Sequence, residues 1–307
     1  MKSLNIVFMG SPEFAVPSME LIHKSRHKIT AVVSNPDKRR GRRGKPVPTD
    51  VKKRALELGL PTIDVEDVKS RSFAEELSDL NADLFVVVAF RILPNHILAI
   101  PKIGSINLHA SLLPKYRGAA PIHWAVINGE KETGTTVFFL TETVDAGKII
   151  GQRSVKIGHG DTTGDVYERL KSDGADLLLS CIHDIAEEKT QEQTQDDSKA
   201  TPAPKLFREN TRIDFSKSAS EVHNLVRGLN PFPGAWCMYS EEKMNIHKTI
   251  PQDGRTVEPG KLLRDGDKLF AGCGEGAVEI TELQLPGKPR ISGNDFANGY
   301  DLSIPLT

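Results

Sequence analysis

The chain has 307 residues and 38% hydrophobic residues, enough for two domains of ordinary size with real cores. Its 40 basic and 41 acidic residues nearly cancel, which excludes a polycation, so any affinity for nucleic acid must come from local patches. The three cysteines are far apart and form no Cys-x-x-Cys pair, which fits a reducing cytoplasm, and no apolar run approaches the roughly 20 residues that span a bilayer.

The first half of the chain alternates short apolar runs with amphipathic segments of helix length. This alternation predicts right-handed βαβ crossovers and a Rossmann-like α/β fold, with a mostly parallel sheet and helices on both faces. Ligands of such sheets bind beyond the carboxyl ends of the strands, so the loops after Ala89 and Leu108 are the first candidates for a site. The expected strands are residues 6–9, 30–33, 84–89 and 105–108, and the expected helices are 14–24, 51–58 and 73–80.

The second half changes character after a long helix. A polar stretch over 187–204 has too few apolar residues to bury a core and is typical of a linker. We therefore expect a catalytic domain at 1–189, a linker at 190–206 and a small, OB-like β-barrel domain at 207–307. The expected elements are strands at 135–140 and 148–157, a helix at 163–188 capped by Asp161 or Thr162, a helix at 220–228, and strands at 235–239, 268–271 and 277–285.

Two polar residues stand where the strand at 105–108 ends. Alternation along a strand places Asn107 and His109 on the same side, so both can converge on one ligand. An amide beside an imidazole is suited to stabilising an oxyanion. The alternative is a strand-end pair that only bonds the backbone, and spacing alone favours that alternative.

The residues that follow change this balance. Ser111-Leu112-Leu113-Pro114 and then Arg117-Gly118-Ala119-Ala120-Pro121-Ile122 give the chain a clear resemblance to the folate-dependent formyltransferases, in particular to those that act on methionyl-tRNA. The resemblance extends into both expected domains. Further similar segments are residues 10–15, 35–37, 133–137, 144–147, 210–215 and 230–235.

The resemblance implies formyl transfer from 10-formyltetrahydrofolate to the amino group of methionyl initiator tRNA, giving formylmethionyl-tRNA. Asn107 and His109 would donate to the developing oxyanion, and Asp145 would orient His109 and help to remove the amine proton. A carboxylate beside an imidazole favours its cationic form. Without the resemblance, Asp145 in its Asp-Ala-Gly context is more often a turn residue.

The resemblance also implies a folate site on the loop after the strand at 84–89. The pterin ring would lie along Phe90, Arg91, Ile92 and Leu93, bound mainly by main-chain groups. The methionyl-tRNA branch often has Tyr-Gly near positions 90 and 91, and this sequence departs from that pattern. Ser111, Leu112, Leu113 and Pro114 would flank the formyl-bearing part of the donor. The isomer of the Leu113-Pro114 bond is left open.

A cationic loop between Asp37 and Arg54 is the feature that is most informative about the acceptor substrate. Glycines and prolines prevent a regular helix through most of it, and its charge suits contacts with phosphates and single-stranded ends. The alternative is an ordinary solvated surface run. The resemblance implies that this loop enters the tRNA acceptor stem, with Arg42 or Arg43 as the important arginine. The expected tRNA-binding residues are Arg39, Arg40, Arg42, Arg43 and Lys45.

Other signals are weak. His23 and His27 are four residues apart but have no evident third ligand, so we expect no metal. The glycines around Cys273 indicate a hairpin turn rather than a dinucleotide site. Alternative functions are formyl transfer to an amino sugar nucleotide, hydrolysis of the formyl-folate, and a non-catalytic tRNA-binding protein. We expect a cytoplasmic monomer that does not contact membranes.

Overall fold

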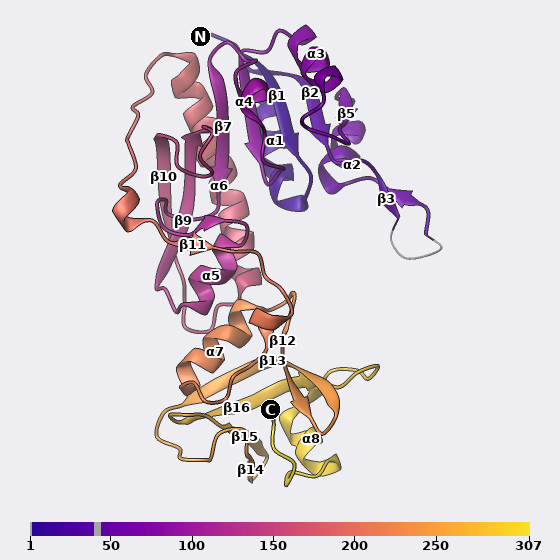
Figure 1. Ribbon diagram of the computed structural model, residues 1–307, viewed down its shortest axis with the longest axis vertical. Helices are drawn as coiled ribbons and strands as arrows, with labels where there is room; N and C mark the ends of the chain where they lie inside the picture. The colour runs from indigo at the N-terminus through magenta and orange to yellow at the C-terminus, as the bar shows by residue number, and fades with distance from the viewer. Residues whose placement is uncertain (1, 40–43) are drawn as a thin grey trace. The chain divides into compact units, whose positions relative to one another are not determined.

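The computed structural model describes residues 2–39 and 44–307 (Figure 1). The chain divides into two compact units. The described parts of Met1–Gly118, Thr133–Val155 and Tyr167–Pro202 make up the first, and Ala119–Glu132, Lys156–Val166 and Ala203–Thr307 the second. The second unit therefore takes two segments from the middle of the chain, which composition did not indicate. The boundaries expected at 189 and 206 stay predictions.

One seven-stranded sheet organises the first unit, with the strand order β10-β9-β7-β6-β1-β2-β5. The strands from β7 to β5 run parallel, and β9 pairs with β7 in the antiparallel direction. This arrangement confirms the predicted mostly parallel α/β sheet; β5 was not predicted. The strands are β1 (Asn5–Gly10), β2 (Lys28–Ser34), β5 (Thr62–Asp64), β6 (Leu84–Val88), β7 (Gly104–His109), β9 (Glu132–Phe139) and β10 (Ile149–Lys156).

The helices of this unit flank the sheet, and three of the five named below begin at a serine or threonine whose side chain accepts a hydrogen bond from the first turn. Thr162 accepts a hydrogen bond from the Asp165 N–H at 3.2 Å and donates its own N–H to the Asp165 carboxylate at 2.8 Å, so Thr162 is the cap of α6. The short helix α4 was not predicted. The helices are α1 (Val16–Lys24), α2 (Asp50–Glu57), α3 (Arg71–Asp79), α4 (Asn95–Leu98) and α6 (Thr163–Ala186).

The core of the first unit explains the continuous apolar runs in its strands. Val7 and Met9 of β1 pack in one cluster with Phe73 of α3. Because neighbouring side chains alternate across a strand, Ile6 and Phe8 point to the opposite face, and both are fully buried there. A sheet buried on both faces requires apolar residues at successive positions, as these strands have.

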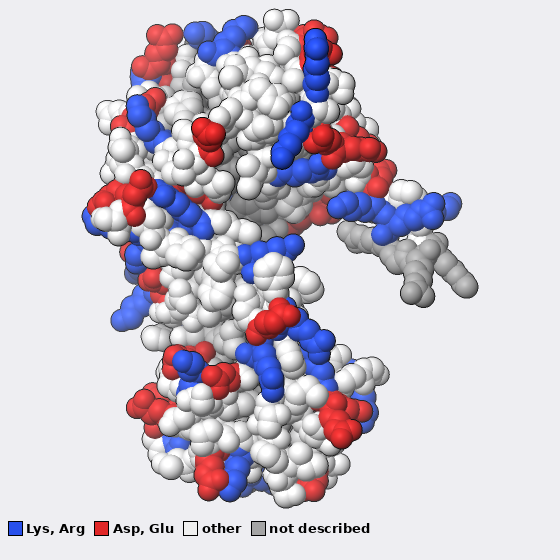
Figure 2. Space-filling view, in the orientation of Figure 1, with Lys and Arg blue, Asp and Glu red and all other residues white. Residues whose placement is uncertain are grey.

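The cationic loop is a short hairpin in its described part. β3 (Lys38–Arg39) pairs antiparallel with β4 (Pro46–Val47), and residues 40–43 lie outside the described chain. Arg39 and Lys45 are exposed, and basic side chains gather at this hairpin (Figure 2). Lys52, by contrast, belongs to α2 and pairs with the carboxylates of Asp37 and Asp64.

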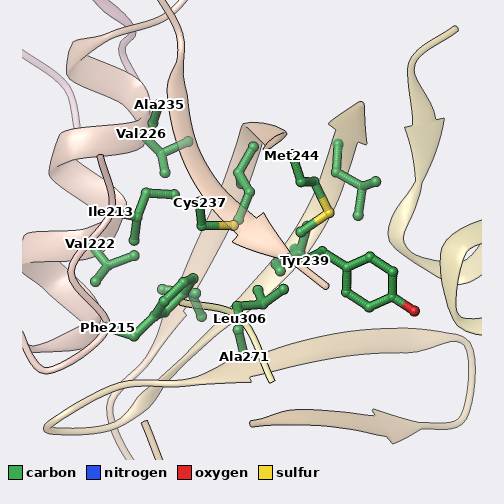
Figure 3. Close-up of a cluster of buried hydrophobic side chains, with 14 of the residues drawn as sticks. Ile213, Phe215, Val222, Val226, Ala235, Cys237, Tyr239, Met244, Ala271 and Leu306 are labelled. Carbon is green, nitrogen blue, oxygen red and sulfur yellow. The ribbon is translucent and has the colours of Figure 1, made fainter. Parts of the chain in front are cut away.

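The second unit is a small antiparallel β domain, as predicted. Its sheet has the order β12-β13-β16-β15-β14, with β17 beside β16. Among the described residues, no strand pairing joins the two end strands, β12 and β14. Apolar residues of the sheet, of α7 and of α8 pack in one core (Figure 3). Its elements are α5 (Pro121–Ile127), α7 (Ala219–Gly228), β12 (Ala235–Tyr239), β13 (Glu242–Gln252), β14 (Leu262–Asp265), β15 (Lys268–Gly272), β16 (Ala277–Gln284), β17 (Ile291–Ser292) and α8 (Gly293–Gly299).

Two further observations concern the whole described chain. Within residues 2–39 and 44–307, no helix combines the length and apolar character that crossing a membrane requires. All three cysteines are free and buried, and burial raises the pKa of the Cys181 and Cys237 thiols to about 12.

Candidate active site

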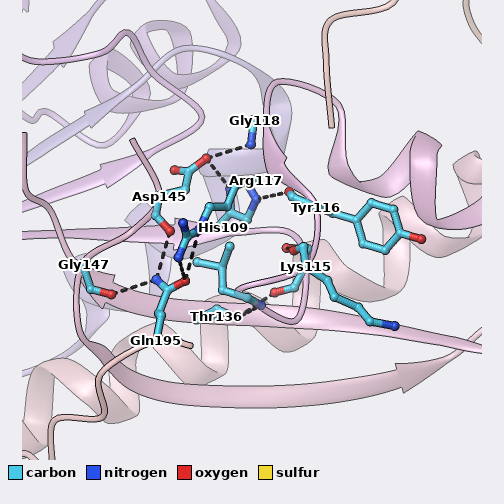
Figure 4. A network of polar contacts seen from close by, with 11 residues as sticks. His109, Lys115, Tyr116, Arg117, Gly118, Thr136, Asp145, Gly147 and Gln195 are labelled. Atoms are coloured by element: carbon cyan, nitrogen blue, oxygen red, sulfur yellow. Dashed lines mark hydrogen bonds and ion pairs between the residues drawn. The ribbon is translucent and has the colours of Figure 1, made fainter. Parts of the chain in front are cut away.

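His109 is the last residue of β7, and both of its ring nitrogens face protein groups (Figure 4). Nε2 lies 2.9 Å from the main-chain oxygen of Tyr116, and because a carbonyl only accepts, Nε2 is the donor. Nδ1 lies 3.8 Å from Oδ2 of Asp145, within range of an ion pair but too long for a hydrogen bond. The structure therefore brings His109 and Asp145 together, as the sequence predicted.

Asp145 lies in the loop between β9 and β10, and its backbone has a φ of 55°, in the left-handed region. Its carboxylate accepts a hydrogen bond from the Gly118 N–H at 2.9 Å. The side chain is 13% exposed, so the carboxylate is largely shielded from water. The Arg-Gly segment thus supplies a donor that fixes the Asp145 carboxylate near His109.

Gln195 completes this network, and sequence reasoning missed it. Its amide donates to the main-chain oxygens of Asp145 and Gly147, and its carbonyl accepts from Arg117 (Figure 4). It belongs to the polar stretch that we interpreted as a linker, because composition does not distinguish a glutamine in water from one that is buried. β11 (Pro202–Ala203) of the same stretch pairs with β8 (Arg117–Gly118).

A cavity of about 100 Å³ lies beside Asp145. Asn107 lines it, and the Asn107 carboxamide makes no hydrogen bond to any described residue. The same cavity is lined by the predicted folate loop. The lining residues are Val87, Phe90, Arg91, Ile92, Leu93, Leu98, Asn107, Leu140, Thr141, Glu142, Val144 and Asp145.

The loop at 90–93 has the character expected of a main-chain recognition surface. In the described structure, its N–H and C=O groups form no hydrogen bonds with protein. The Arg91 guanidinium is already engaged, because it donates to the Asn35 side chain and to the main-chain oxygens of Val65 and Glu66. Arg91 therefore anchors the loop and leaves its main-chain groups available to a ligand.

Residues 111–114 occupy a different position. Ser111 donates to the Lys115 oxygen at 2.6 Å, and the Leu113 N–H donates to Thr136 at 3.1 Å. Leu113 is buried in a small core, and the Leu113-Pro114 bond is cis. None of these residues lines the cavity described above, so the contact of Ser111–Pro114 with folate stays a prediction.

The predicted tRNA-binding residues fall into two groups. Arg39 and Lys45 are exposed on the hairpin. Arg40, Arg42 and Arg43 lie outside the described residues. Over residues 2–39 and 44–307, no three His, Cys, Asp or Glu side chains come together in a group that could hold a metal.

Similarity to known proteins agrees with this geometry. Residues 1–182 match the formyl transferase family, and residues 205–301 match its C-terminal domain. The chain belongs to the formyl transferase family. The methionyl-tRNA formyltransferase of Chlorobium luteolum is 43% identical over 304 residues, covering 97% of each protein, and that of Chlorobium phaeovibrioides is 42% identical, covering 97% of this chain and 95% of the relative.

Solved structures show the same fold at lower identity. The sugar N-formyltransferase WlaRD, solved in the presence of dTDP and 5-N-formyl-THF, superposes with a TM-score of 0.69 at 20% identity. The match covers 93% of this chain and 99% of that one. This identity supports the formyl transferase fold and does not identify the acceptor.

Proposed function

We propose that this formyl transferase moves the formyl group of 10-formyltetrahydrofolate to the amino group of methionyl initiator tRNA, giving formylmethionyl-tRNA for translation initiation. Among the relatives named methionyl-tRNA formyltransferase, that of Chlorobium luteolum is 43% identical over 97% of this chain. The observation that carries the chemistry is the cavity where the unpaired Asn107 carboxamide and the Asp145 carboxylate lie beside the main-chain groups of residues 90–93.

This cavity fits a folate donor. A pterin ring presents hydrogen-bond donors and acceptors along one edge, and the free N–H and C=O groups of residues 90–93 are complementary to such an edge. Leu93 and Leu98 add apolar surface for the flat ring. The formyl group would then lie toward Asn107 at the end of β7.

The reaction needs a donor for the oxyanion and an acceptor for a proton. The amine nitrogen forms a bond to the formyl carbon, and the carbonyl oxygen becomes an oxyanion that the Asn107 carboxamide stabilises. Asp145 receives the proton of the amine, directly or through one water. The oxyanion then re-forms the carbonyl, and the bond between the formyl carbon and the folate N10 breaks. The bonding pair of electrons stays on N10, which takes the proton from Asp145.

We propose a more restricted role for His109 than the resemblance implies. Its Nε2–H is already donated to Tyr116, so it reaches the oxyanion only when the ring turns away from that carbonyl. We propose that Asn107 is the principal donor and that His109 supports Asp145 and joins the oxyanion contact once substrate is bound. Catalytic hydrogen bonds often shorten only in the substrate complex.

The hairpin supports an RNA acceptor. Arg39 and Lys45 are exposed on its described part, and Arg40, Arg42 and Arg43, which lie outside the described residues, fall between them in the sequence. Lys52 and Arg54, which follow in α2, form ion pairs with carboxylates. Their positive charges are therefore partly neutralised and attract phosphates less strongly. We propose that the hairpin cations contact phosphates near the acceptor end of the tRNA.

The discriminating experiment compares acceptors. The purified protein would receive 10-formyltetrahydrofolate with methionyl initiator tRNA, with an amino sugar nucleotide, or with no acceptor. We expect formylmethionine on the tRNA and little reaction in the other two mixtures. Formyl transfer to the sugar alone, or release of formate without an acceptor, would overturn the proposal.

We also propose that the enzyme is a monomer that works in the cytoplasm. Its three cysteines are free thiols, which a reducing compartment preserves. Light scattering of the purified protein at several concentrations would detect any larger assembly.

A further inference from the structure

The side-chain amide of Gln195 is fully hydrogen-bonded to protein, although the residue lies in the polar stretch between the two expected domains. Nε2 lies 2.9 Å from the main-chain oxygen of Asp145 and 2.8 Å from that of Gly147. Oε1 accepts from Nη2 of Arg117 at 2.7 Å and from Nε at 3.3 Å. The residue is only 9% exposed, so these bonds replace those it would make with water.

Gln195 holds a backbone segment that lies in the left-handed region. Asp145 has a φ of 55°, which is uncommon for a residue with a β-carbon, although a single aspartate adopts it more readily than most residues. Gln195 bonds the carbonyl of Asp145 itself and that of Gly147, so it bridges the Asp145–Ala146 and Gly147–Lys148 peptide units. A rotation of either unit out of its present orientation would break a bond to a buried amide.

The other end of Gln195 acts on the Asp145 carboxylate. Arg117 is held between Gln195 and Asp197, and the next residue is Gly118, whose N–H donates to Asp145 Oδ2 at 2.9 Å. One side chain therefore supports both the main chain of Asp145 and the segment that supplies the donor to its carboxylate. Together, these bonds determine where the carboxylate lies relative to His109.

We infer that Gln195 is a positioning residue for formyl transfer, which holds Asp145 in the orientation that places its carboxylate beside His109. The inference rests on the catalytic role proposed for Asp145. It assigns part of the active site to the stretch at 190–206, whose composition is typical of a linker. The competing view is that Gln195 only attaches this stretch to the first unit.

The test compares two substitutions with a matched control. Gln195→Ala removes every hydrogen bond of the side chain, and Gln195→Glu keeps an acceptor for Arg117 but directs a carboxylate at two carbonyl oxygens. Gln193→Ala is the control, because the Gln193 side chain is exposed and forms no hydrogen bond with the described residues. We expect kcat to fall about 10- to 100-fold in both Gln195 variants, with KM for folate and for tRNA within about twofold of the wild type.

The pH profile separates positioning from mere attachment. If Asp145 is displaced from His109, the pH dependence of kcat should change in the Gln195 variants and stay as in wild type for Gln193→Ala. A loosened linker alone would raise KM for tRNA without moving the profile. An unchanged profile together with a kcat within about twofold of wild type in both Gln195 variants would overturn the inference.

Hydrogen exchange gives a readout that does not need activity. The Gly118 amide is bonded to the Asp145 carboxylate, so its exchange should accelerate at least about tenfold in Gln195→Ala and stay unchanged in Gln193→Ala. If the wild-type protein transfers no formyl group, the proposed function fails, while the exchange rates still report whether Gln195 positions Asp145. Equal Gly118 exchange in all three proteins would contradict the positioning role.

Discussion

The Gly118 N–H donates to the Asp145 carboxylate at 2.9 Å, although 27 positions separate the two residues in the chain. Gly118 follows the segment whose Tyr116 carbonyl accepts from His109. One short loop therefore contacts both the imidazole and the carboxylate of the site. A test of Asp145 should therefore remove its negative charge while keeping the hydrogen bond from Gly118 that holds its side chain in place.

The substitution Asp145→Asn should reduce kcat by about 10²- to 10⁴-fold, the range typical of a lost general base. The amide keeps an oxygen that can accept from Gly118, so the loop should stay in place while the negative charge disappears. Single-turnover formyl transfer measures the loss, and the melting temperature should stay close to that of the wild type.

Asp79→Asn is the matched control for this substitution. Asp79 is exposed at the end of α3 and loses the same charge by the same change, and it does not line the cavity beside Asp145. Its kcat should stay within about threefold of wild type. Wild-type turnover by Asp145→Asn would remove Asp145 from the mechanism.

The substitution Asn107→Ala should reduce kcat by about 10²- to 10³-fold, because it removes an oxyanion donor worth about 3 to 4 kcal/mol. The Asn107 carboxamide has no partner in the described protein, so its loss leaves no buried group unsatisfied and stability should change little. Steady-state kinetics should show an effect on kcat and little on KM. Asn95→Ala, at an exposed position of α4, serves as the control. An equal loss in both proteins would contradict the assignment.

Removal of the hairpin charge should affect tRNA and not folate. In Arg39→Ala with Lys45→Ala, we expect weaker tRNA binding and a slope of log K against log salt that becomes shallower by about one for each phosphate no longer neutralised. Arg42→Ala with Arg43→Ala, which lie outside the described residues, should act in the same direction. Folate affinity should stay unchanged. A matching fall in folate affinity would place the hairpin in the donor site instead.

The stability of the protein should fall as the pH drops below about 6.5, in part because of His27. Burial, then His183, then Arg26 lower the pKa of His27 from 6.5 to about 4. His27 Nδ1 accepts from the Leu4 N–H at 3.2 Å, so the neutral ring donates from Nε2 to His183 at 3.0 Å. The unfolded chain binds a proton here more readily, so this contribution is complete above pH 6.5 and is lost toward pH 4.

Urea unfolding between about pH 4 and 8 measures this dependence. The pKa shift corresponds to about 3 to 4 kcal/mol, because each unit is worth about 1.4 kcal/mol. In His27→Gln the slope between about pH 4 and 6.5 should become shallower, whereas His96→Gln, at an exposed position of α4, should keep the slope of the wild type. Parallel curves for wild type and His27→Gln would rule out His27 as the source.

Local patterns in the sequence were enough to predict the main strands of the first unit and the chemistry of its site. The apolar runs around Phe8 and Val86 predicted strands of a sheet buried on both faces, because burial on both faces requires apolar residues at every position. The two-residue spacing of Asn107 and His109 and the motif after them indicated the chemistry. These inferences need only a few neighbouring residues, and such patterns can be read directly from a sequence.

Only the tertiary structure decided how distant groups are used. It showed that Nε2 of His109 is donated to Tyr116, that the Asn107 amide is left without a partner in the described chain, and that Gln195 holds the backbone of Asp145. A glutamine looks the same in the sequence whether its side chain is hydrated or hydrogen-bonded to a remote carbonyl. Its partner depends on how the whole chain packs, and for Gln195 that partner lies 50 positions away.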